Sequence, residues 1–261
     1  MAQITKVRSP FPALRSFTVP AIACCLGAQV LAQQNDIPLN REIYFDLDRN
    51  HARIDTTGQQ AVHTAMRPYI ESRANTHHVL GYRVDTTRHF YTLSEKLFKE
   101  HLFIVDEDDF HLTIDPVFQF ELGQDFRDPS TFADTTRFYH NARGFRVAGD
   151  LGGRFSFQTS FYENQAIFPQ YLYQYAQTTG VVPGQGRIKG FKNRAFDFAF
   201  ASGNVSWTPS EWLNIQFGNG KHFVGNGYRS VLLSDNAFNY PYLKFSLQSN
   251  NRKWQYTTFH A

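Results

Sequence analysis

The stretch that decides the fold is FHLTIDPVFQFEL, residues 110–122. Every second residue from Phe110 to Leu122 is apolar, and most of the residues between them are polar. Because successive side chains of a strand point to opposite faces, the run predicts a strand with one apolar and one polar face. It would be about 43 Å long, whereas a globular strand has about five or six residues and a tilted membrane strand about nine to eleven. Length and alternation together predict a transmembrane β-barrel strand.

The alternation recurs along the rest of the chain. Residues 145–151 and 155–161 alternate on either side of Gly152 and Gly153, which predicts a hairpin. In residues 196–207 the apolar parity changes after Ser202 and Gly203, which predicts a β-bulge. Short turns also alternate with long connections, as is typical of outer-membrane barrels. Further strands are predicted at 213–217, 241–248 and 252–261, and long connections at 123–138, 164–193 and 218–240.

The predicted fold class is therefore all-β. We expect an antiparallel outer-membrane β-barrel, with about the first seven strands of a larger barrel present, preceded by a short mixed or helical N-terminal segment. An open sheet of seven strands would leave two unpaired edges in lipid, where each unsatisfied backbone group is costly. We therefore expect the natural protein to continue past Ala261 with a comparable number of strands.

The chain divides into three predicted regions. Residues 1–32 read as a cleaved signal peptide, with basic residues first, then an apolar run that ends in small residues at Val30 and Ala32. Both cysteines, Cys24 and Cys25, lie in this region, and a lipid anchor at Cys24 is the alternative. Residues 33–109 are predicted to be a periplasmic or plug-like segment, and residues 110–261 a partial barrel. The expected location is the cell outer membrane.

The charge balance excludes a nucleic-acid partner. The chain has 26 Lys and Arg against 23 Asp and Glu, but three of the basic residues lie in residues 1–32, which contain no acidic residue. The remaining chain has 23 of each sign. A nucleic-acid surface needs a basic excess that survives processing. The partners that we expect are outer-membrane lipid and surface polysaccharide, with other surface or motility proteins as further candidates.

The candidate ligand-binding residues follow residue 217. A Gly-rich block at 218–230 contains Lys221, His222 and Arg229, and it lacks the helix that a phosphate-binding loop needs. It is followed by Asp235, Asn236 and Asn239, whose side chains can either cap turns or bind sugar hydroxyls. Basic groups here could also pair with an acidic group of a glycan. These six residues are the candidate glycan contacts.

No catalytic or metal site is predicted. His77 and His78 are adjacent, so on a strand they would point to opposite faces, and the acidic run at 106–109 lacks the ligand spacing of a calcium loop. The chain has no Gly-x-Ser-x-Gly elbow. We therefore expect a non-enzymatic protein with no metal and no cofactor. Tyrosines 171, 173 and 175 lie in a predicted long loop and could stack on a sugar, although interfacial aromatic residues are the common alternative.

Several blocks carry a resemblance to a known family. The stretches YENQ (162–165), VPGQGR (182–187), residues 218–230 and LLSDNAFNYPY (232–242) resemble the capsule assembly Wzi family, in particular its Bacteroidetes branch of RemB-like gliding motility proteins. The resemblance implies an outer-membrane barrel of about eighteen strands with an N-terminal helical element. It also implies extracellular loops that hold capsular polysaccharide, or a surface protein that assists gliding.

Three functions remain open from the sequence. The first is a non-enzymatic barrel that binds or organises capsular or surface polysaccharide. The second is a gliding-motility or adhesion component that works through protein partners. The third is a porin-like channel lined by the polar parity of the strands.

Overall fold

The computed structural model describes residues 34–51, 65–74, 91, 100–251 and 253–261. The predicted signal peptide and the pair His77 and His78 lie outside these residues. Within the described residues, none of the helices is long and apolar enough to cross a membrane.

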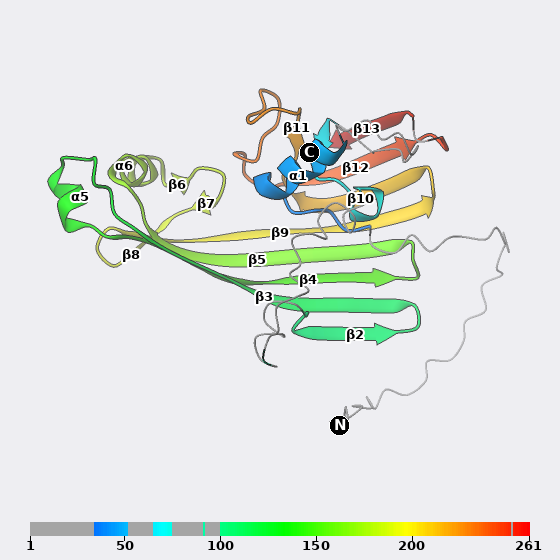
Figure 1. Ribbon diagram of the computed structural model, residues 1–261, viewed down its shortest axis with the longest axis horizontal. Helices are drawn as coiled ribbons and strands as arrows, with labels where there is room; N and C mark the ends of the chain where they lie inside the picture. Colours follow the sequence, from blue (N-terminus) through cyan, green and yellow to red (C-terminus); the bar gives the residue numbers. More distant parts are fainter. Residues whose placement is uncertain (1–33, 52–64, 75–90, 92–99, 252) are drawn as a thin grey trace.

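A large curved antiparallel sheet dominates the molecule (Figure 1). Among the described residues it has nine strands: the order β13-β12-β10-β9-β5-β4-β3-β2 forms one path, and β8 pairs with β9 beside it. The path ends at β2 on one side and β13 on the other, so the sheet is open. The strands are β2 (Phe103–Glu107), β3 (Phe110–Gly123), β4 (Phe138–Leu151), β5 (Phe155–Ile167), β8 (Lys189–Phe191), β9 (Ala195–Ser210), β10 (Leu213–Gly220), β12 (Tyr240–Gln248) and β13 (Gln255–His260).

The prediction of an all-β antiparallel fold is confirmed. The seven predicted strands correspond to β3, β4, β5, β9, β10, β12 and β13, and the predicted hairpin joins β4 to β5 through Gly152 and Gly153, both at positive φ. Two short strands of this sheet were missed, β2 and β8. Because β2 pairs with β3, the sheet begins at Phe103, inside the region that we assigned to the N-terminal segment.

The predicted bulge in β9 was wrong. Residues 196–207 of β9 pair with β5 in continuous register, from Ala166 opposite Phe196 to Phe155 opposite Trp207. The apolar parity changes because the surroundings of one face change along the strand. Phe196 and Phe198 are buried in a small apolar core, whereas Asn204 and further along Ser206 and Thr208 are buried on the same face within a polar interior.

The two faces of the sheet are inverted relative to a water-soluble sheet. The inner face buries polar side chains, and the outer face exposes apolar ones, such as Phe118, Phe120 and Leu122, each more than 60% exposed. This contrast follows the alternation of the strands. The buried polar residues of the strands are Thr113, Asp150, Ser156, Asn164, Asn204, Ser206, Thr208, Asn214, Gln216, Lys244, Ser246 and Gln248.

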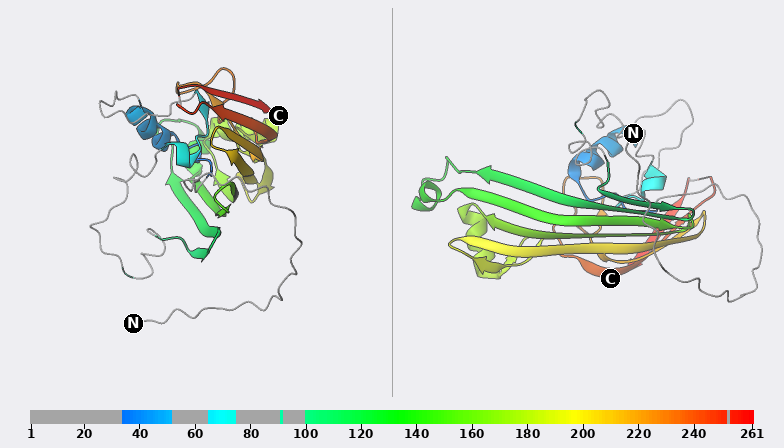
Figure 2. Two further views of the ribbon diagram at one scale, coloured as in Figure 1. Left: turned by 90° about the vertical axis from the view of Figure 1, so that its right-hand side faces the viewer. Right: turned by 90° about the horizontal axis from the view of Figure 1, so that it is seen from below.

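The N-terminal elements lie on the inner face of the sheet (Figure 2). They are α1 (Arg41–His51), β1 (Met66–Arg67) and α2 (Glu71–Ala74), and β1 pairs with β11 (Phe223–Val224). The side chain of Asn40 caps α1 by accepting from the N–H of Glu42 at 2.9 Å. These elements form a small apolar core of their own, which consists of Ile37, Tyr44, Leu47, Tyr69 and Ala74.

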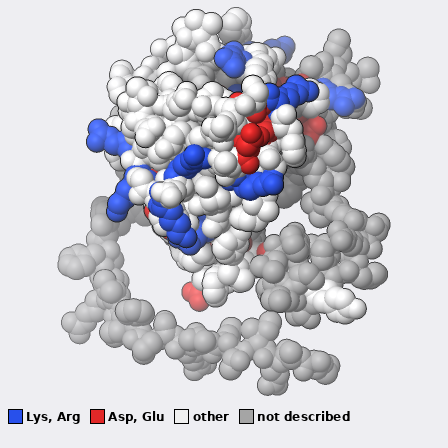
Figure 3. Space-filling view, turned by 90° about the vertical axis from the view of Figure 1, so that its left-hand side faces the viewer, with Lys and Arg blue, Asp and Glu red and all other residues white. Residues whose placement is uncertain are grey.

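A cap of short elements covers the sheet where β4 and β9 begin and β5 ends. It contains α5 (Thr131–Thr135), α6 (Gln170–Thr179), β6 (Val181–Val182), β7 (Gly186–Arg187) and the β8–β9 turn. The predicted loop around tyrosines 171, 173 and 175 is thus a helix, which ends at Gly180 with φ 74°. Lys and Arg side chains are spread over this end of the molecule (Figure 3).

Candidate functional site

Asp36 anchors the N-terminal segment to the inner face of the sheet. Its Oδ1 accepts from Gln216 Nε2 at 2.9 Å and its Oδ2 from Asn204 Nδ2 at 3.0 Å. Asp36 and Gln216 are buried, and Lys244 is buried nearby as the opposing charge. Burial raises the pKa of Asp36, and this effect exceeds the lowering by Lys244 and the two amides.

The neighbouring residues reinforce this anchor. The N–H of Gln34 donates to Ser156 Oγ at 3.0 Å, and Ser156 in turn donates to Asp150. Asp36 also forms an isolated bridge with Ile70, so the segment before α1 is held between the sheet and the residues before α2. Through these contacts, residues 34–36 are held against the inner face of the sheet.

A cavity of about 650 Å³ lies between this segment, the inner face of the strands and the loops at 183–185 and 235–239. Its wall combines amide side chains, aromatic rings and one arginine. The amide group of Asn164 lies beside His140, with Nε2 of the histidine 3.1 Å from Oδ1. Other lining residues from the strands are Gln119, Arg146, Gln158, Tyr162, Phe200 and Asn204.

Arg146 is the one arginine among the described residues of this wall. It lies on β4 at the cross-strand position opposite Asp115 of β3, while the Asp115 carboxylate is 2.6 Å from His101 Nδ1. Within the described part of the chain, Arg146 takes part in no ion pair. Its guanidinium can therefore bind an acidic or hydroxyl group that enters the cavity.

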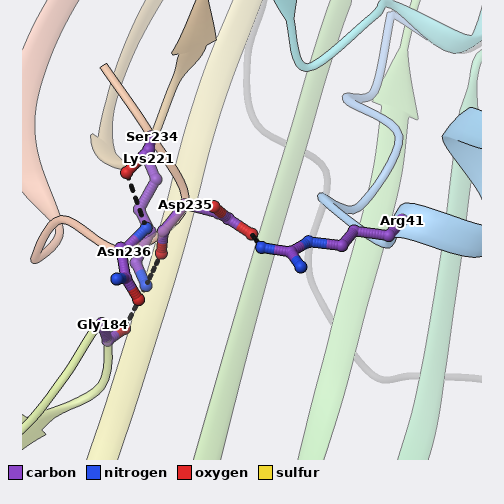
Figure 4. Close-up of polar contacts among 6 residues, drawn as sticks. All are labelled: Arg41, Gly184, Lys221, Ser234, Asp235 and Asn236. Atoms are coloured by element: carbon purple, nitrogen blue, oxygen red, sulfur yellow. Dashed lines mark hydrogen bonds and ion pairs between the residues drawn. The ribbon is translucent and has the colours of Figure 1, made fainter. Parts of the chain in front are cut away.

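Lys221 joins two loops at the rim of the cavity. Its Nζ donates to the backbone oxygens of Gly184 and of Asp235, the latter at 3.1 Å (Figure 4). The Nζ also lies 4.9 Å from the centre of the Phe200 ring. Burial lowers the pKa of Lys221, against the effect of the Asp235 charge. Although Lys221 lines the cavity, its hydrogen bonds hold the loops together.

Asp235, Asn236 and Asn239 also line the cavity. The Asp235 carboxylate accepts from Arg41 at 3.2 Å, so it links the loop to α1 (Figure 4). The N–H of Asn236 donates to Ser234 Oγ at 3.2 Å, which leaves the Asn236 side chain against Gly184. Asn239 Nδ2 donates to the backbone oxygen of Ala201, while its Oδ1 is buried and has no hydrogen-bond partner in the part of the chain that the structure describes.

The structure separates His222 and Arg229 from this group. His222 is fully buried between the rings of Tyr240, Tyr242 and Phe259, and its Nδ1 lies 3.1 Å from Tyr240 Oη. Burial lowers its pKa to about 3, so this imidazole is neutral at ordinary pH. Arg229 is exposed and does not line the cavity. The sequence prediction thus placed four of its six residues at one cavity.

Sequence reasoning missed the strand residues of the cavity. Gln119, Arg146, Gln158 and Asn164 belong to the polar parity of β3, β4 and β5. The alternation places each of them on the inner face, but it does not say where along the strand the interior is hollow. That depends on the course of residues 34–39, which show no such pattern.

Among the described residues, no group of three or more His, Asp or Glu side chains is arranged to hold a metal ion. The acidic run at 106–109 comprises the last two residues of β2 and the two-residue turn to β3, with Asp108 at φ 38°. Comparison with known proteins found no matching family model, no matching curated protein and no matching solved structure.

Proposed function

We propose that this chain is part of the wall of a non-enzymatic outer-membrane β-barrel that binds or organises surface polysaccharide. The single observation that carries the proposal is the inverted sheet. In water, each large apolar side chain left exposed forgoes roughly 1.5–3 kcal/mol of burial free energy. Contact with lipid removes this cost, which is why the strands of outer-membrane barrels place apolar residues outward.

The extent of the outer apolar face fits this proposal. On β3 it runs from Phe110 to Leu122, thirteen residues, and a tilted membrane strand needs about nine to eleven. On β4 and β5 the apolar side chains stop at an exposed cross-strand pair, Arg143 Nε to Glu163 Oε2 at 2.9 Å. Level with that pair and beyond it, β3 still carries the exposed Phe118, Phe120 and Leu122, so the apolar surface reaches further toward the cap of α5 and α6 on β3 than on β4 and β5.

The cavity favours a carbohydrate as the ligand. Amide groups both donate and accept hydrogen bonds, as sugar hydroxyls require, and aromatic rings such as Tyr162 and Phe200 offer apolar faces. Arg146 adds a cation for an acidic sugar. The resemblance to the capsule assembly Wzi family, noted in the sequence, points to the same class of ligand.

The N-terminal segment favours binding over conduction. Gln34 and Asp36 bind the inner face of the strands, and Tyr44 and Leu47 pack in the N-terminal core that follows them, where a porin would hold water. A porin-like channel is therefore the less supported candidate. Planar-bilayer recordings of the purified protein test it directly, since a sustained conductance would favour the channel.

The main experiment measures binding of the purified surface polysaccharide of the source bacterium to the full-length protein in detergent micelles by calorimetry. We expect Arg146→Gln to weaken binding about 10- to 150-fold, because a hydrogen bond to a charged group contributes about 1.5–3 kcal/mol. The matched control is Arg229→Gln, which alters an exposed arginine outside the cavity and should bind as the wild type does.

Two further results bear on the proposal. Fractionation should place the protein in the outer membrane, and a deletion strain should shed capsule. Absence of polysaccharide binding, together with normal capsule and a loss of surface spreading in the deletion strain, would support the motility alternative instead.

A further inference from the structure

A second cavity, of about 530 Å³, lies between α1 and the segment from Phe223 to Asp235. Its size is in the range of ligand pockets. The carbohydrate site proposed above does not use it. Two of its lining residues, Leu39 and Asp235, also line the first cavity, so the two hollows meet at these residues.

The boundary between the cavities is an ion pair. Arg41 reaches from the first turn of α1 to Asp235 Oδ2 at 3.2 Å (Figure 4). The guanidinium also lies over the ring of Tyr228, with Cζ 4.2 Å from the ring centre. The backbone oxygen of Asp235 accepts from Lys221, which fixes the position of this boundary from the side of the first cavity.

The second cavity presents aromatic rings to a ligand. Tyr228 is 72% exposed and Phe45 is 66% exposed, and they come from opposite walls, the loop and α1. Large aromatic side chains exposed within a hollow are unusual unless something covers them. Beside them, Asn226 lines the cavity and uses its Oδ1 to accept from Arg67 at 3.0 Å, so its NH₂ group is the part of the amide that can donate to a ligand.

We propose that the second cavity is a further carbohydrate subsite, and that the two cavities together bind an oligosaccharide chain that passes over the Arg41–Asp235 pair. Sugar rings stack on Phe45 and Tyr228, and hydroxyl groups bind Asn226 and the boundary pair. This inference rests on the function proposed above, and it adds that the ligand is an extended chain bound across several sugar units.

The test is the dependence of affinity on ligand length. Surface polysaccharide of the source bacterium, partially hydrolysed and separated by size, provides short and long fragments for titration against the full-length protein in micelles. We expect long fragments to bind the wild type at least 10-fold more tightly than short ones. In Phe45→Ala and in Tyr228→Ala this gain should disappear, while the affinity for short fragments stays unchanged.

Phe126→Ala is the matched control, because Phe126 is 87% exposed in the connection between β3 and α5, outside both cavities. It should keep the full gain with length. Equal affinity of the wild type for all fragments, or a full gain retained in both variants, overturns the second subsite while the first cavity stands. Failure of every fragment to bind instead overturns the proposed function itself.

Discussion

Replacement of Asp36 tests how the N-terminal segment is held on the inner face. In Asp36→Ala, the side-chain NH₂ groups of Asn204 and Gln216 lose the acceptor that each now contacts at 2.9–3.0 Å. A buried donor left without an acceptor costs about 1–3 kcal/mol. Two such donors give a loss of about 2–6 kcal/mol, which corresponds to at least a roughly 30-fold rise in the opening equilibrium of the segment.

Asp36→Asn is the informative second variant, because it keeps the size and removes the charge. The side-chain oxygens of Asn204 and Gln216 are buried and have no hydrogen-bond partner among the described residues. One of these amides can therefore rotate to accept from the new NH₂ group, while the other still donates to the remaining oxygen. We expect Asp36→Asn to restore most of the hydrogen-bonding energy that Asp36→Ala loses.

The pH dependence separates charge from hydrogen bonding. Because burial raises the pKa of Asp36, the folded state binds the proton more tightly than the unfolded state does. The stabilisation that Asp36 contributes is therefore full below its unfolded pKa of about 3.9 and is lost as the pH rises through the raised folded value. The free energy of unfolding of the wild type minus that of Asp36→Asn should accordingly fall with rising pH.

Hydrogen exchange of the full-length protein in micelles measures this directly. The reporters are the N–H of Ile37, bound to the Tyr69 oxygen, and the N–H of Glu71, bound to the Asn35 oxygen, both at 2.9 Å. Unchanged protection of both amides in Asp36→Ala would refute the anchoring role. A difference between wild type and Asp36→Asn that grows with pH would show that attraction to Lys244 outweighs burial.

Three further predictions concern other parts of the fold. His222→Phe should reduce the loss of stability on acidification from about pH 6.5, since a pKa lowered to about 3 makes the native state bind protons more weakly than the unfolded chain, and acid titrations of unfolding check this. Gly144→Ala should prevent assembly, because an added Cβ would overlap the backbone of Phe161. Gly190→Ala is the control, since a Cβ there meets no atom within 4 Å. The intensity of the folded band in electrophoresis of unheated samples compares the two variants. Lys221→Met should speed proteolysis of the loops at 183–185 and 235–239, since two charge-assisted hydrogen bonds worth about 1.5–3 kcal/mol each are lost, and Lys253→Met, in the exposed turn before β13, should not.

The strands could be predicted because alternation is a local property. From Phe110 to Leu122 and from Phe155 to Phe161, residues two positions apart lie on the same face and have the same polarity. Both strands, and which of their faces is apolar, could therefore be predicted from the sequence. The same rule failed in β9. There the inner face passes from the apolar core around Phe198 to the polar interior around Asn204, a change that only packing against α6 explains.

The candidate site was predictable in part for a related reason. Asp235, Asn236 and Asn239 lie in one loop, so their proximity is built into the chain. His222 was placed wrongly at the ligand surface, because a histidine in a Gly-rich block gives no sign of the tyrosines of β12 that enclose it. The ion pair of Arg41 with Asp235 could not be predicted from the sequence, since the two residues are 194 positions apart.

The anchor at residues 34–36 has a consequence for the timing of assembly. Its partners lie far along the chain: Ser156 at a separation of 122 residues, Asn204 at 168 and Gln216 at 180. Contacts over such separations form late, because the intervening chain must first be ordered. The contact between Asp36 and Gln216 can form only after β10 is in place. Residues 34–36, although first among the described residues, are therefore expected to be among the last to become ordered during folding.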